Sequence, residues 1–414
     1  MLHTVSPVFA RPSVGHHWGF RVIAFAFAAS LAFSTVPTPL YALYQRQDGF
    51  PTFVVTIVFA AYAVGVMVSL YLAGHVSDWL GRRRVIVAAT LAEAVAAALF
   101  LSSPELPVLV LARLISGAGV GALTATATAH LAELRAIARP GEHTGRAGLI
   151  ASVVNLGGLG LGPFVGGFFA QYATSPLTTP FAVFLVVLLV AAAAVALVPE
   201  TVEPWDERPA YRPQRLALPA EAKQPFFGAA IAVFASFAIT GLFAALAPTL
   251  LAQGLHQTGR LLAGVTAASL LAAAALGQVL FARVPIARQL RYGFVLMAVG
   301  LVVLPAAAML GSLWLFFAGS VLAGTGMGLG FRASIATVAA LAGPRSRGQV
   351  LAALFLAAYA GLVVPVLVVG LALVWVSSPV ALLGFSVAEL GLLAWSANRI
   401  LRPASRPVPA ASRA

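Results

Sequence analysis

A short polar run between two long apolar stretches combines an acid with three consecutive arginines. From residue 74 it reads Gly-His-Val-Ser-Asp-Trp-Leu-Gly-Arg-Arg-Arg. Asp78 precedes Arg82 by four positions, and Gly81 between them permits a tight turn of the chain. Because arginine donates charge-assisted hydrogen bonds to carboxylates, the chemistry open to this run is ion pairing.

Five ionisable side chains stand alone inside long apolar stretches. A charge in a membrane helix costs several kcal/mol, so it usually faces the protein interior and has a function. Glu93 and Glu389 are therefore proton-site candidates, and Arg332, with no acid near it in sequence, can pair with a substrate anion or a distant carboxylate. His130 is of a type that titrates near neutral pH, although a histidine satisfied by a neighbouring helix is the simpler interpretation. For Arg113 the alternative is snorkelling to the membrane interface.

The amino-acid composition indicates that lipid is the main solvent around this chain. Of the 414 residues, 61% are hydrophobic and only 9% are charged, whereas a soluble domain has about 25% charged residues. A spanning helix needs about 20 mostly apolar residues, and in lipid the backbone must satisfy its own hydrogen bonds. The apolar runs are continuous over that length and do not alternate with polar residues, so they predict helices and not barrel strands.

Twelve such helices are predicted, and one polar stretch separates the first six from the last six. The fold class is therefore an all-α membrane protein with two six-helix bundles. The expected organisation is a tail over 1–19, a bundle over 20–198, a loop over 199–225, a bundle over 226–400 and a tail over 401–414. The predicted helices are 20–43, 53–74, 84–102, 106–132, 146–171, 179–198, 226–252, 260–281, 291–309, 312–341, 348–374 and 379–400.

The basic residues predict the orientation. With the N-terminus inside, the segments facing the cytoplasm hold 21 of the 25 Lys and Arg residues. The outer segments hold only Arg46 and Arg260, and Arg113 and Arg332 lie within helices. This bias predicts both termini in the cytoplasm. The net charge of +13 does not indicate a nucleic-acid binder, because the basic residues form no single face or domain.

The two halves of the chain resemble each other. Gly-Ala-Gly-Val-Gly occupies 117–121 in the fourth predicted helix, and Gly-Thr-Gly-Met-Gly occupies 324–328 in the tenth. The two glycine triplets lie 207 positions apart. Duplicated halves around a site at the midplane are a known plan of transporters.

The polar run at 74–84 resembles the loop signature of the major facilitator superfamily, in which glycine, aspartate, glycine and basic residues recur at this spacing. Trp79 departs from it, since the family usually has a basic residue there. The resemblance implies a network of Asp78, Arg82 and Glu133 that locks the outward-open state and breaks on inward opening. The alternative is an ordinary basic loop. The residues of this motif are Gly74, Asp78, Gly81, Arg82, Arg83 and Glu133.

Two further runs carry the same resemblance. Arg113 and the glycines after it resemble the family's arginine motif, which in proton-coupled relatives tunes a nearby carboxylate. The fifth helix resembles the motif of the drug:proton antiporter branch, where glycines allow close packing and Pro163 kinks the helix. Generic packing of small residues is the alternative. The matching residues of the fifth helix are Gly158, Gly162, Pro163, Gly166 and Gly167.

The first helix contains Pro37 and Pro39, which should bend or break it and free carbonyl groups to line a cavity. The resemblance implies that helices 1, 4, 7 and 10 line this cavity. Aromatic side chains there would offer stacking and cation–π surface, although helix or lipid packing explains each of them alone. The candidate cavity residues are Tyr41, Tyr44, Asn155, Phe237, Thr240, Phe243 and Arg332.

The expected function is a secondary transporter of the bacterial inner membrane, a monomer that exports small, lipophilic or aromatic compounds in exchange for protons. Helices 1 and 7 hold no acid, so the coupling residue stays open, and import of a metabolite such as an organic acid or a sugar is the alternative. A membrane-embedded enzyme or receptor would need a catalytic set or a large soluble domain, and neither is visible. No phosphate-binding loop, metal-ligand cluster or cysteine occurs, so no cofactor or metal is expected, and the expected partners are the substrate, protons and lipid.

Overall fold

The computed structural model describes residues 15–73, 76–141, 144–202, 223–341 and 347–401. In these segments the chain forms helices and no strand, as the sequence predicts. The helices are α1 His16–Thr35, α2 Pro37–Asp48, α3 Thr52–Ala73, α4 Ser77–Leu80, α5 Arg82–Ser102, α6 Leu106–Ala138, α7 Thr144–Tyr172, α8 Thr179–Ala196, α9 Lys223–Gly254, α10 Arg260–Leu280, α11 Ile286–Leu310, α12 Leu313–Leu341, α13 Arg347–Ala372 and α14 Ser378–Ile400.

Twelve candidate membrane spans occur in the described part of the chain, which confirms the predicted number. Helices α1 and α2 together form the first span, and the short α4 is too small to count as one. Several helices run past the predicted ends: α6 continues to Ala138 and α11 already begins at Ile286. Hydropathy detects only the apolar centre of a span, while the backbone hydrogen bonds of a helix continue into the polar interface.

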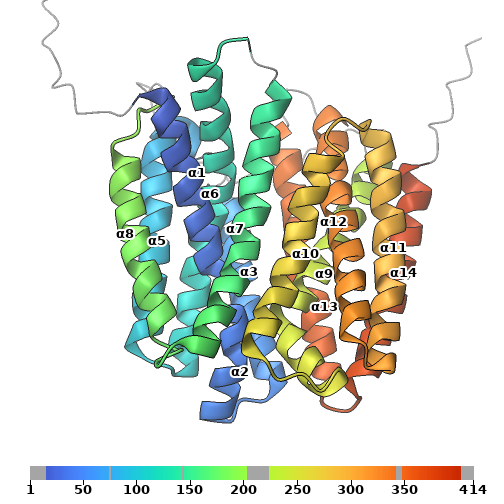
Figure 1. The fold of residues 1–414 in the computed structure, drawn as a ribbon. Helices are drawn as coiled ribbons and strands as arrows, with labels where there is room; N and C mark the ends of the chain where they lie inside the picture. Colours follow the sequence, from blue (N-terminus) through green and yellow to red (C-terminus); the bar gives the residue numbers. More distant parts are fainter. Residues whose placement is uncertain (1–14, 74–75, 142–143, 203–222, 342–346, 402–414) are drawn as a thin grey trace, which may run out of the picture.

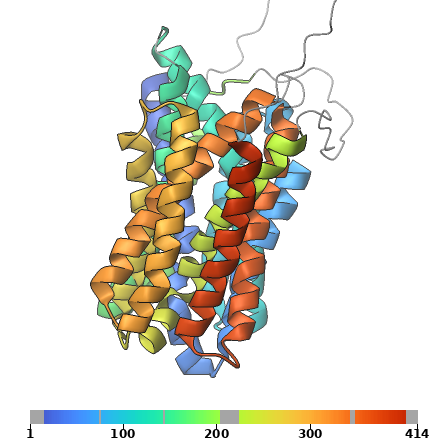
Figure 2. The same cartoon turned by 90° about the vertical axis from the view of Figure 1, so that its right-hand side faces the viewer.

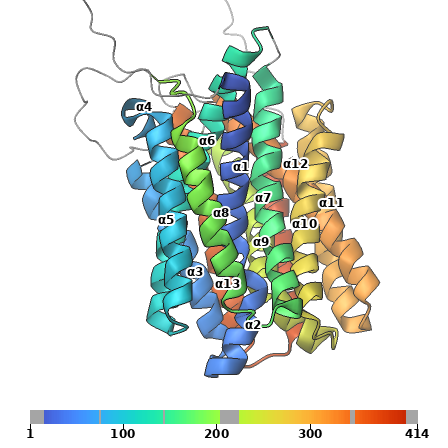
Figure 3. The same cartoon turned by 60° about the vertical axis from the view of Figure 1, so that its left-hand side comes forward.

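The helices form two groups that stand side by side (Figure 1). Helices α1 to α8, blue to green, make the N-terminal half, and α9 to α14, yellow to red, make the C-terminal half. We call the end at which α5 begins, with Arg82, Arg83 and Arg84, the arginine-rich end; it is at the top of Figures 1 and 3, where α4 lies. Helix α2 lies at the opposite, arginine-poor end. The start of α1 and the end of α14 both lie at the arginine-rich end.

The first span is broken by its prolines, as predicted. Helix α1 ends at Thr35, and α2 begins at Pro37 after the single linking residue Val36. Proline has no N–H, so Pro37 and Pro39 cannot bond the carbonyl groups four residues before them. The break places the end of α1, at Thr35, beside the central pocket described below.

In the N-terminal half, the glycines of α6 set how closely it packs. Gly117 and Gly121 face α3: a Cβ on Gly121 would lie 2.8 Å from the Val66 carbonyl oxygen, and one on Gly117 would collide with the Tyr62 carbonyl. Gly119 faces α5 instead, with the Ala89 carbonyl oxygen 3.0 Å from such a Cβ. The fourth span therefore packs on the second through two glycines and on the third through one.

The C-terminal half repeats this arrangement. Cβ atoms on Gly324 and Gly328 of α12 would collide with carbonyl oxygens of α10, the eighth span. Gly326 faces α11, the ninth span, with the Gly293 carbonyl oxygen 2.7 Å from an added Cβ. The repeated glycines therefore make corresponding contacts in the two halves, on the second and third spans in one and on the eighth and ninth in the other.

Helix α7 connects the two halves through glycines on both of its sides. Gly158, Gly162 and Gly166 face α1 and α2: a Cβ on Gly158 would lie 2.9 Å from the Ala28 carbonyl oxygen. Gly167 faces α10, where the Arg260 carbonyl oxygen is 3.0 Å from an added Cβ. Backbones this close slide or tilt with little side-chain obstruction. Helices α3 and α13 make a second contact between the halves.

Candidate functional site

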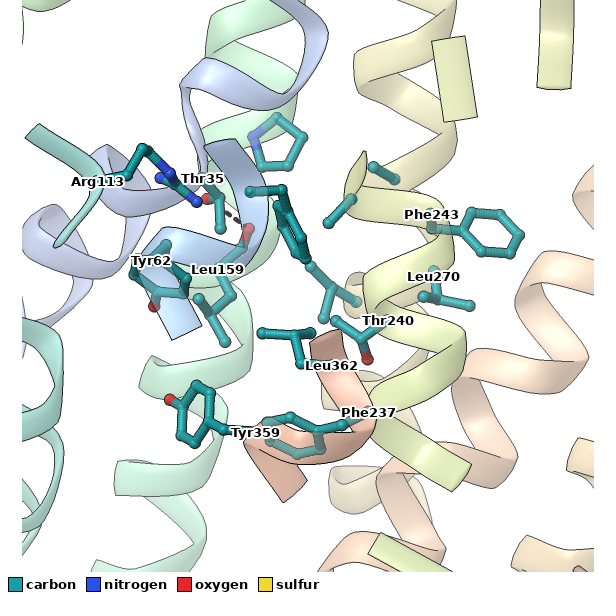
Figure 4. A pocket seen from close by; sticks show the side chains of 15 residues that line it. Thr35, Tyr62, Arg113, Leu159, Phe237, Thr240, Phe243, Leu270, Tyr359 and Leu362 are labelled. Carbon is teal, nitrogen blue, oxygen red and sulfur yellow. Dashed lines mark hydrogen bonds between the residues drawn. The ribbon is translucent and has the colours of Figure 1, made fainter. Parts of the chain in front are cut away.

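A pocket lies between the two halves near the middle of the spans (Figure 4). It contains about 540 Å³ of space not filled by atoms. Its lining comes from α1, α3, α6 and α7 on one side and from α9, α10 and α13 on the other. A ligand there would contact both halves at once.

Aromatic side chains form much of the pocket wall. Phe59 and Tyr62 of α3 contribute from the N-terminal half, and Phe237 and Tyr359 from the C-terminal half. The ring centroids of Phe237 and Tyr359 are 5.5 Å apart in an edge-to-face pair, at the lower edge of Figure 4. Such a lining suits a ligand with a flat, apolar body.

Arg113 is the one charged side chain among the described residues that line this pocket. It is only 2% exposed, so it faces the interior and does not snorkel to the interface. Its guanidinium carbon lies 4.4 Å from the centroid of the Tyr62 ring, and its Nη1 donates a 2.5 Å hydrogen bond to the Ser34 carbonyl. Its Nε atom has no hydrogen-bond partner in the described structure. The positive charge of Arg113 is thus stabilised by the Tyr62 ring and the Ser34 carbonyl, and its Nε N–H can still donate to a ligand.

Glu93 is on α5, which packs on α6, one of the helices that line the pocket. It is completely buried, and Ser116 Oγ donates a 2.8 Å hydrogen bond to its Oε2. Its Oε1 has no described partner. Ser116 follows Arg113 by three residues and so lies on the same face of α6. A buried carboxyl, a hydroxyl and an arginine thus lie in a series that ends at the pocket.

Glu389, the other predicted proton-site carboxyl, lies elsewhere. It is 2% exposed on α14, and its Oε2 has no described partner. Helix α14 packs on α9 and α11 and covers the flank of the C-terminal half that is remote from the N-terminal half (Figures 1 and 2). Glu389 does not line the central pocket.

The predicted cavity residues divide into two groups. Phe237, Thr240 and Phe243 do line the pocket. Phe243, however, directs its ring away from the N-terminal side chains, as Figure 4 shows, and packs on Phe316 with 5.7 Å between ring centroids. The hydroxyl of Thr240 bonds the Ser236 carbonyl oxygen at 3.1 Å.

Four other predicted cavity residues do not line it. Tyr41 and Tyr44 are buried in the N-terminal half, and Asn155 is half-buried on α7. Arg332 is on α12, which contributes no residue to the described lining, although the resemblance implied that the tenth span would. The close glycine packing of α12 on α10 explains this placement, since it leaves α10 between α12 and the pocket.

Arg332 belongs instead to a polar chain that crosses from one half to the other. Its Nη1 donates to the Gln278 carbonyl at 3.0 Å. The side chain of Gln278 donates to the Gly328 carbonyl at 3.1 Å and accepts a 2.6 Å hydrogen bond from Ser152 of α7. The sequence offered no local signal for this link, because Gln278 and Ser152 occur in no recognisable motif.

Thr35, at the end of α1, satisfies a carbonyl group that Pro163 leaves free. Proline at position 163 cannot donate to the carbonyl four residues earlier, which is that of Leu159. The hydroxyl of Thr35 donates to this carbonyl at 2.9 Å (dashed in Figure 4). The kinked part of α7 is therefore tied to the broken first span beside the pocket.

At the arginine-rich end, the structure brings together the three members of the expected charge network. Arg82 Nη1 lies 2.6 Å from Asp78 Oδ1, and Arg82 Nη2 lies 3.3 Å from Glu133 Oε1. Ser77 Oγ accepts a further bond from Arg82 at 2.7 Å. All these partners belong to the N-terminal half. Gly74 lies outside the described residues.

Glu200 completes this network and was not predicted as a site residue. Its carboxylate accepts the backbone N–H groups of Arg82 at 2.9 Å and of Arg83 at 3.1 Å, at the start of α5. The N-terminus of a helix favours such an anion. Gly81 makes the approach possible, because its φ is +98° and a Cβ would lie 2.6 Å from Glu200 Oε2.

His130 is linked to the same network through Thr201. The hydroxyl of Thr201 donates to Glu133 Oε2 at 2.5 Å and lies 2.9 Å from His130 Nδ1. His130 is completely buried, and its Nε2 has no described partner. Unlike His130 and Glu133, Thr201 was not predicted as a site residue.

A sequence model of the Major Facilitator Superfamily matches residues 23–365. The chain belongs to the major facilitator superfamily. It is therefore a multi-pass membrane protein of a family of transporters that bind small-molecule substrates, and its family and fold are not those of an enzyme.

Comparisons with individual proteins agree with this assignment. Uncharacterized MFS-type transporters from two strains of Mycobacterium tuberculosis, CDC 1551 / Oshkosh and ATCC 25618 / H37Rv, are 28% identical to this chain over 153 residues. The match covers 37% of this chain and 21% of each relative, so the chain spans about a fifth of the length of these relatives. The crystal structure of the human organic anion transporter MFSD10 (TETRAN) superposes with a TM-score of 0.67 at 17% identity, and the match covers 92% of this chain and 100% of that chain. At that identity the likeness concerns the fold.

Proposed function

We propose that this protein exports small lipophilic or aromatic organic compounds in exchange for protons. The observation that carries the proposal is the series Glu93, Ser116 and Arg113, which leads from a buried carboxyl to the wall of an aromatic pocket. The pocket would bind the substrate between the halves. Protonation of Glu93 would change the field around Arg113 and so bias which side of the membrane the pocket faces.

Access to the central pocket would alternate between the two sides of the membrane through a rocking motion of the two halves. Helix α7 supports it, because its glycines allow backbone-to-backbone contact with both α1 and α10. The Asp78–Arg82–Glu133 network would hold the arginine-rich end in one conformation and break in the other. Glu200 would extend this lock to the segment after α8.

The proposed location is the bacterial inner membrane, with the arginine-rich end in the cytoplasm. The support is the distribution of basic residues, which cytoplasmic loops collect. Residues 1–19 and 401–414 would then be cytoplasmic tails, 199–225 a cytoplasmic loop, and 20–198 and 226–400 the two membrane bundles. The working unit would be a monomer, since the central pocket is formed by one chain.

The test is transport by the purified protein in liposomes. Vesicles with an acidic lumen are diluted into neutral buffer containing a labelled aromatic compound, chosen from a panel of anionic, neutral and cationic members. Proton-driven exchange predicts accumulation of at least one compound, which a protonophore abolishes. Flux that is saturable but insensitive to the pH gradient would contradict proton exchange, and no flux of any compound would contradict the transport proposal for this class.

The direction is tested separately in cells. Expression in a host lacking its own exporters should raise resistance to a toxic compound from the transported group. Import of a metabolite such as an organic acid is the second candidate, favoured by the presence of Arg113 in the pocket. It predicts increased cellular uptake of one nutrient and no gain in resistance.

A further inference from the structure

A second pocket lies at the arginine-poor end, away from the central one. It contains about 390 Å³ of space not filled by atoms. One side comes from α2 of the N-terminal half, and the other from α9, the start of α10 and the segment between them. Helix α2 lies between the two halves at this end (Figure 1). The pocket is thus at the point where the halves would separate if this end opened.

Both arginines that the charge distribution leaves at this end line this one pocket. Arg46 is on α2, and Arg260 begins α10, so each half supplies one. None of the described residues that line the pocket is acidic; the other polar side chains are Gln257 and Thr258. Two positive side chains meeting at one cleft cost energy through mutual repulsion, and an anion bound between them would remove that cost.

Neither guanidinium has used all its donors. Arg260 Nη1 donates to the Ala170 carbonyl at 2.9 Å, which anchors the side chain next to α7. A guanidinium has five N–H donors, so that bond leaves several for a ligand. Arg46 is exposed. An anchored arginine and an exposed one that line the same pocket form an arrangement suited to a carboxylate, sulfonate or phosphate group.

The lining of the central pocket is also positively charged. Arg113 is the one charged side chain among its described lining residues, in a wall of aromatic and aliphatic groups. A molecule that moves between the two pockets would therefore meet fixed positive charge and apolar surface, with no described acid in either lining. Fixed charges of one sign attract ions of the opposite sign and repel those of the same sign.

We infer that the substrate is an organic anion with an aromatic or apolar body, and that Arg46 and Arg260 form a recognition site for its acidic group at the outer mouth. The central pocket holds the body, next to Arg113. This inference rests on the proposed transport function and on the orientation given above, and it names the substrate class in either direction of transport.

Three compounds with one ring system test it: naphthalene-2-sulfonate, naphthalene-2-sulfonamide and N,N,N-trimethyl-2-naphthylammonium, which are anionic, neutral and cationic. Transport of the two ions into proteoliposomes is measured directly, and the neutral compound is tested as a competitor because it crosses bilayers unaided. The inference predicts saturable flux of the sulfonate, weak competition by the sulfonamide and no flux of the ammonium compound. Flux of the ammonium compound without that of the sulfonate overturns the inference but leaves the transport function standing. Flux of neither ion, with no saturable binding of the sulfonamide, counts against the transport function itself.

Variants locate the outer site. Arg46→Gln is expected to raise the KM for the sulfonate about tenfold, the effect of losing one charge-assisted contact, while kcat changes less. Arg46→Lys should restore most of the affinity, because it keeps the charge. Arg288→Gln is the matched control, since Arg288 is an exposed arginine on α11 that lines neither pocket. Arg260→Gln should act in the same direction as Arg46→Gln. An Arg46→Gln protein with the KM of the unchanged protein overturns the outer site.

Discussion

The two halves of this protein share one packing plan but differ in chemistry. The shift of 207 residues that aligns the glycines of α6 and α12 also aligns Arg113 with Ser320. In the C-terminal half, the hydroxyl of Ser320 lies 3.2 Å from the hydroxyl of Ser269. Glu93 faces Gly119 of α6. Met297 faces the matching Gly326 of α12, so an apolar side chain takes the place of Glu93.

The pair Glu93 and Ser116 is likewise replaced by uncharged residues. Ala323 aligns with Ser116, and its Cβ would lie 2.7 Å from a Cβ on Gly300. The C-terminal half therefore packs without a buried charge at these positions. Because the same packing forms without them, Glu93 and Arg113 are not needed to build the fold, and buried charge that the fold does not need points to function.

The largest expected effect comes from removing the charged residue of the matched pair Arg113 and Ser320. Arg113→Ala should lower transport about 100-fold, because it removes a buried charge together with its ring and carbonyl contacts next to the substrate. Ser320→Ala at the matched position should change transport less than about twofold, the range of a neutral hydroxyl whose removal leaves little unpaired. Initial rates in proteoliposomes at equal protein content measure both. Equal losses in the two variants would mean that the halves do not differ in the way described.

The two buried carboxyls give the next comparison. Glu93→Gln should abolish accumulation driven by a pH gradient while leaving downhill exchange of substrate measurable, because the amide keeps the shape but cannot take up a proton. Glu389→Gln should preserve both activities, since Glu389 is on α14 and does not line the central pocket. Parallel measurements of driven and downhill flux separate coupling from binding. Coupling that survives in Glu93→Gln and is lost in Glu389→Gln would move the proton site to the C-terminal half.

A smaller effect is expected at the arginine-rich end. Helix α5 begins with Arg82, whereas its counterpart in the C-terminal half, α11, begins with the apolar Ile286. Arg82→Gln keeps a polar side chain at this position but should slow transport about tenfold by removing both ion pairs.

The stability of this variant should fall by no more than about 1 kcal/mol, because Asp78 is largely exposed. Arg84→Gln is the control, as Arg84 is an exposed residue in the same first turn of α5. Transport rates and thermal unfolding midpoints are compared for the two variants. A rate of Arg82→Gln equal to that of Arg84→Gln would exclude a gating function for this network.

The smallest expected effect concerns the tie between the first span and the kinked α7. Thr35→Val should destabilise the protein by about 1 kcal/mol, because the Leu159 carbonyl loses its donor. Thr35→Ser keeps the hydroxyl and should behave as the unchanged protein. Unfolding midpoints in detergent measure the difference. If Thr35→Val unfolds like Thr35→Ser, another group satisfies that carbonyl.

The sequence was informative wherever physics acts along the chain. Hydropathy predicted twelve spans because a lipid solvent requires about 20 apolar residues in each. The prolines at 37 and 39 predicted the break in the first span because proline lacks an N–H. The glycine triplets predicted a duplicated plan, which the packing of α6 and α12 confirms. The interior position of Arg113 could also be anticipated, from the cost of exposing a charge to lipid.

What the sequence could not determine was which helix faces which. Tyr62 and Tyr359 carry no local pattern, yet they meet at one pocket from chain positions far apart. Tyr41 and Arg332 were predicted to line the cavity and do not, because helix rotation and the close packing of α12 on α10 decide which side chains reach it. The apolar pattern of a buried membrane helix is nearly uniform around its circumference, so it fixes that a segment crosses the membrane but not its rotation. Only the tertiary packing, set by carbonyl-to-glycine contacts between distant segments, brought Glu93 to Ser116 and Arg113 to the pocket.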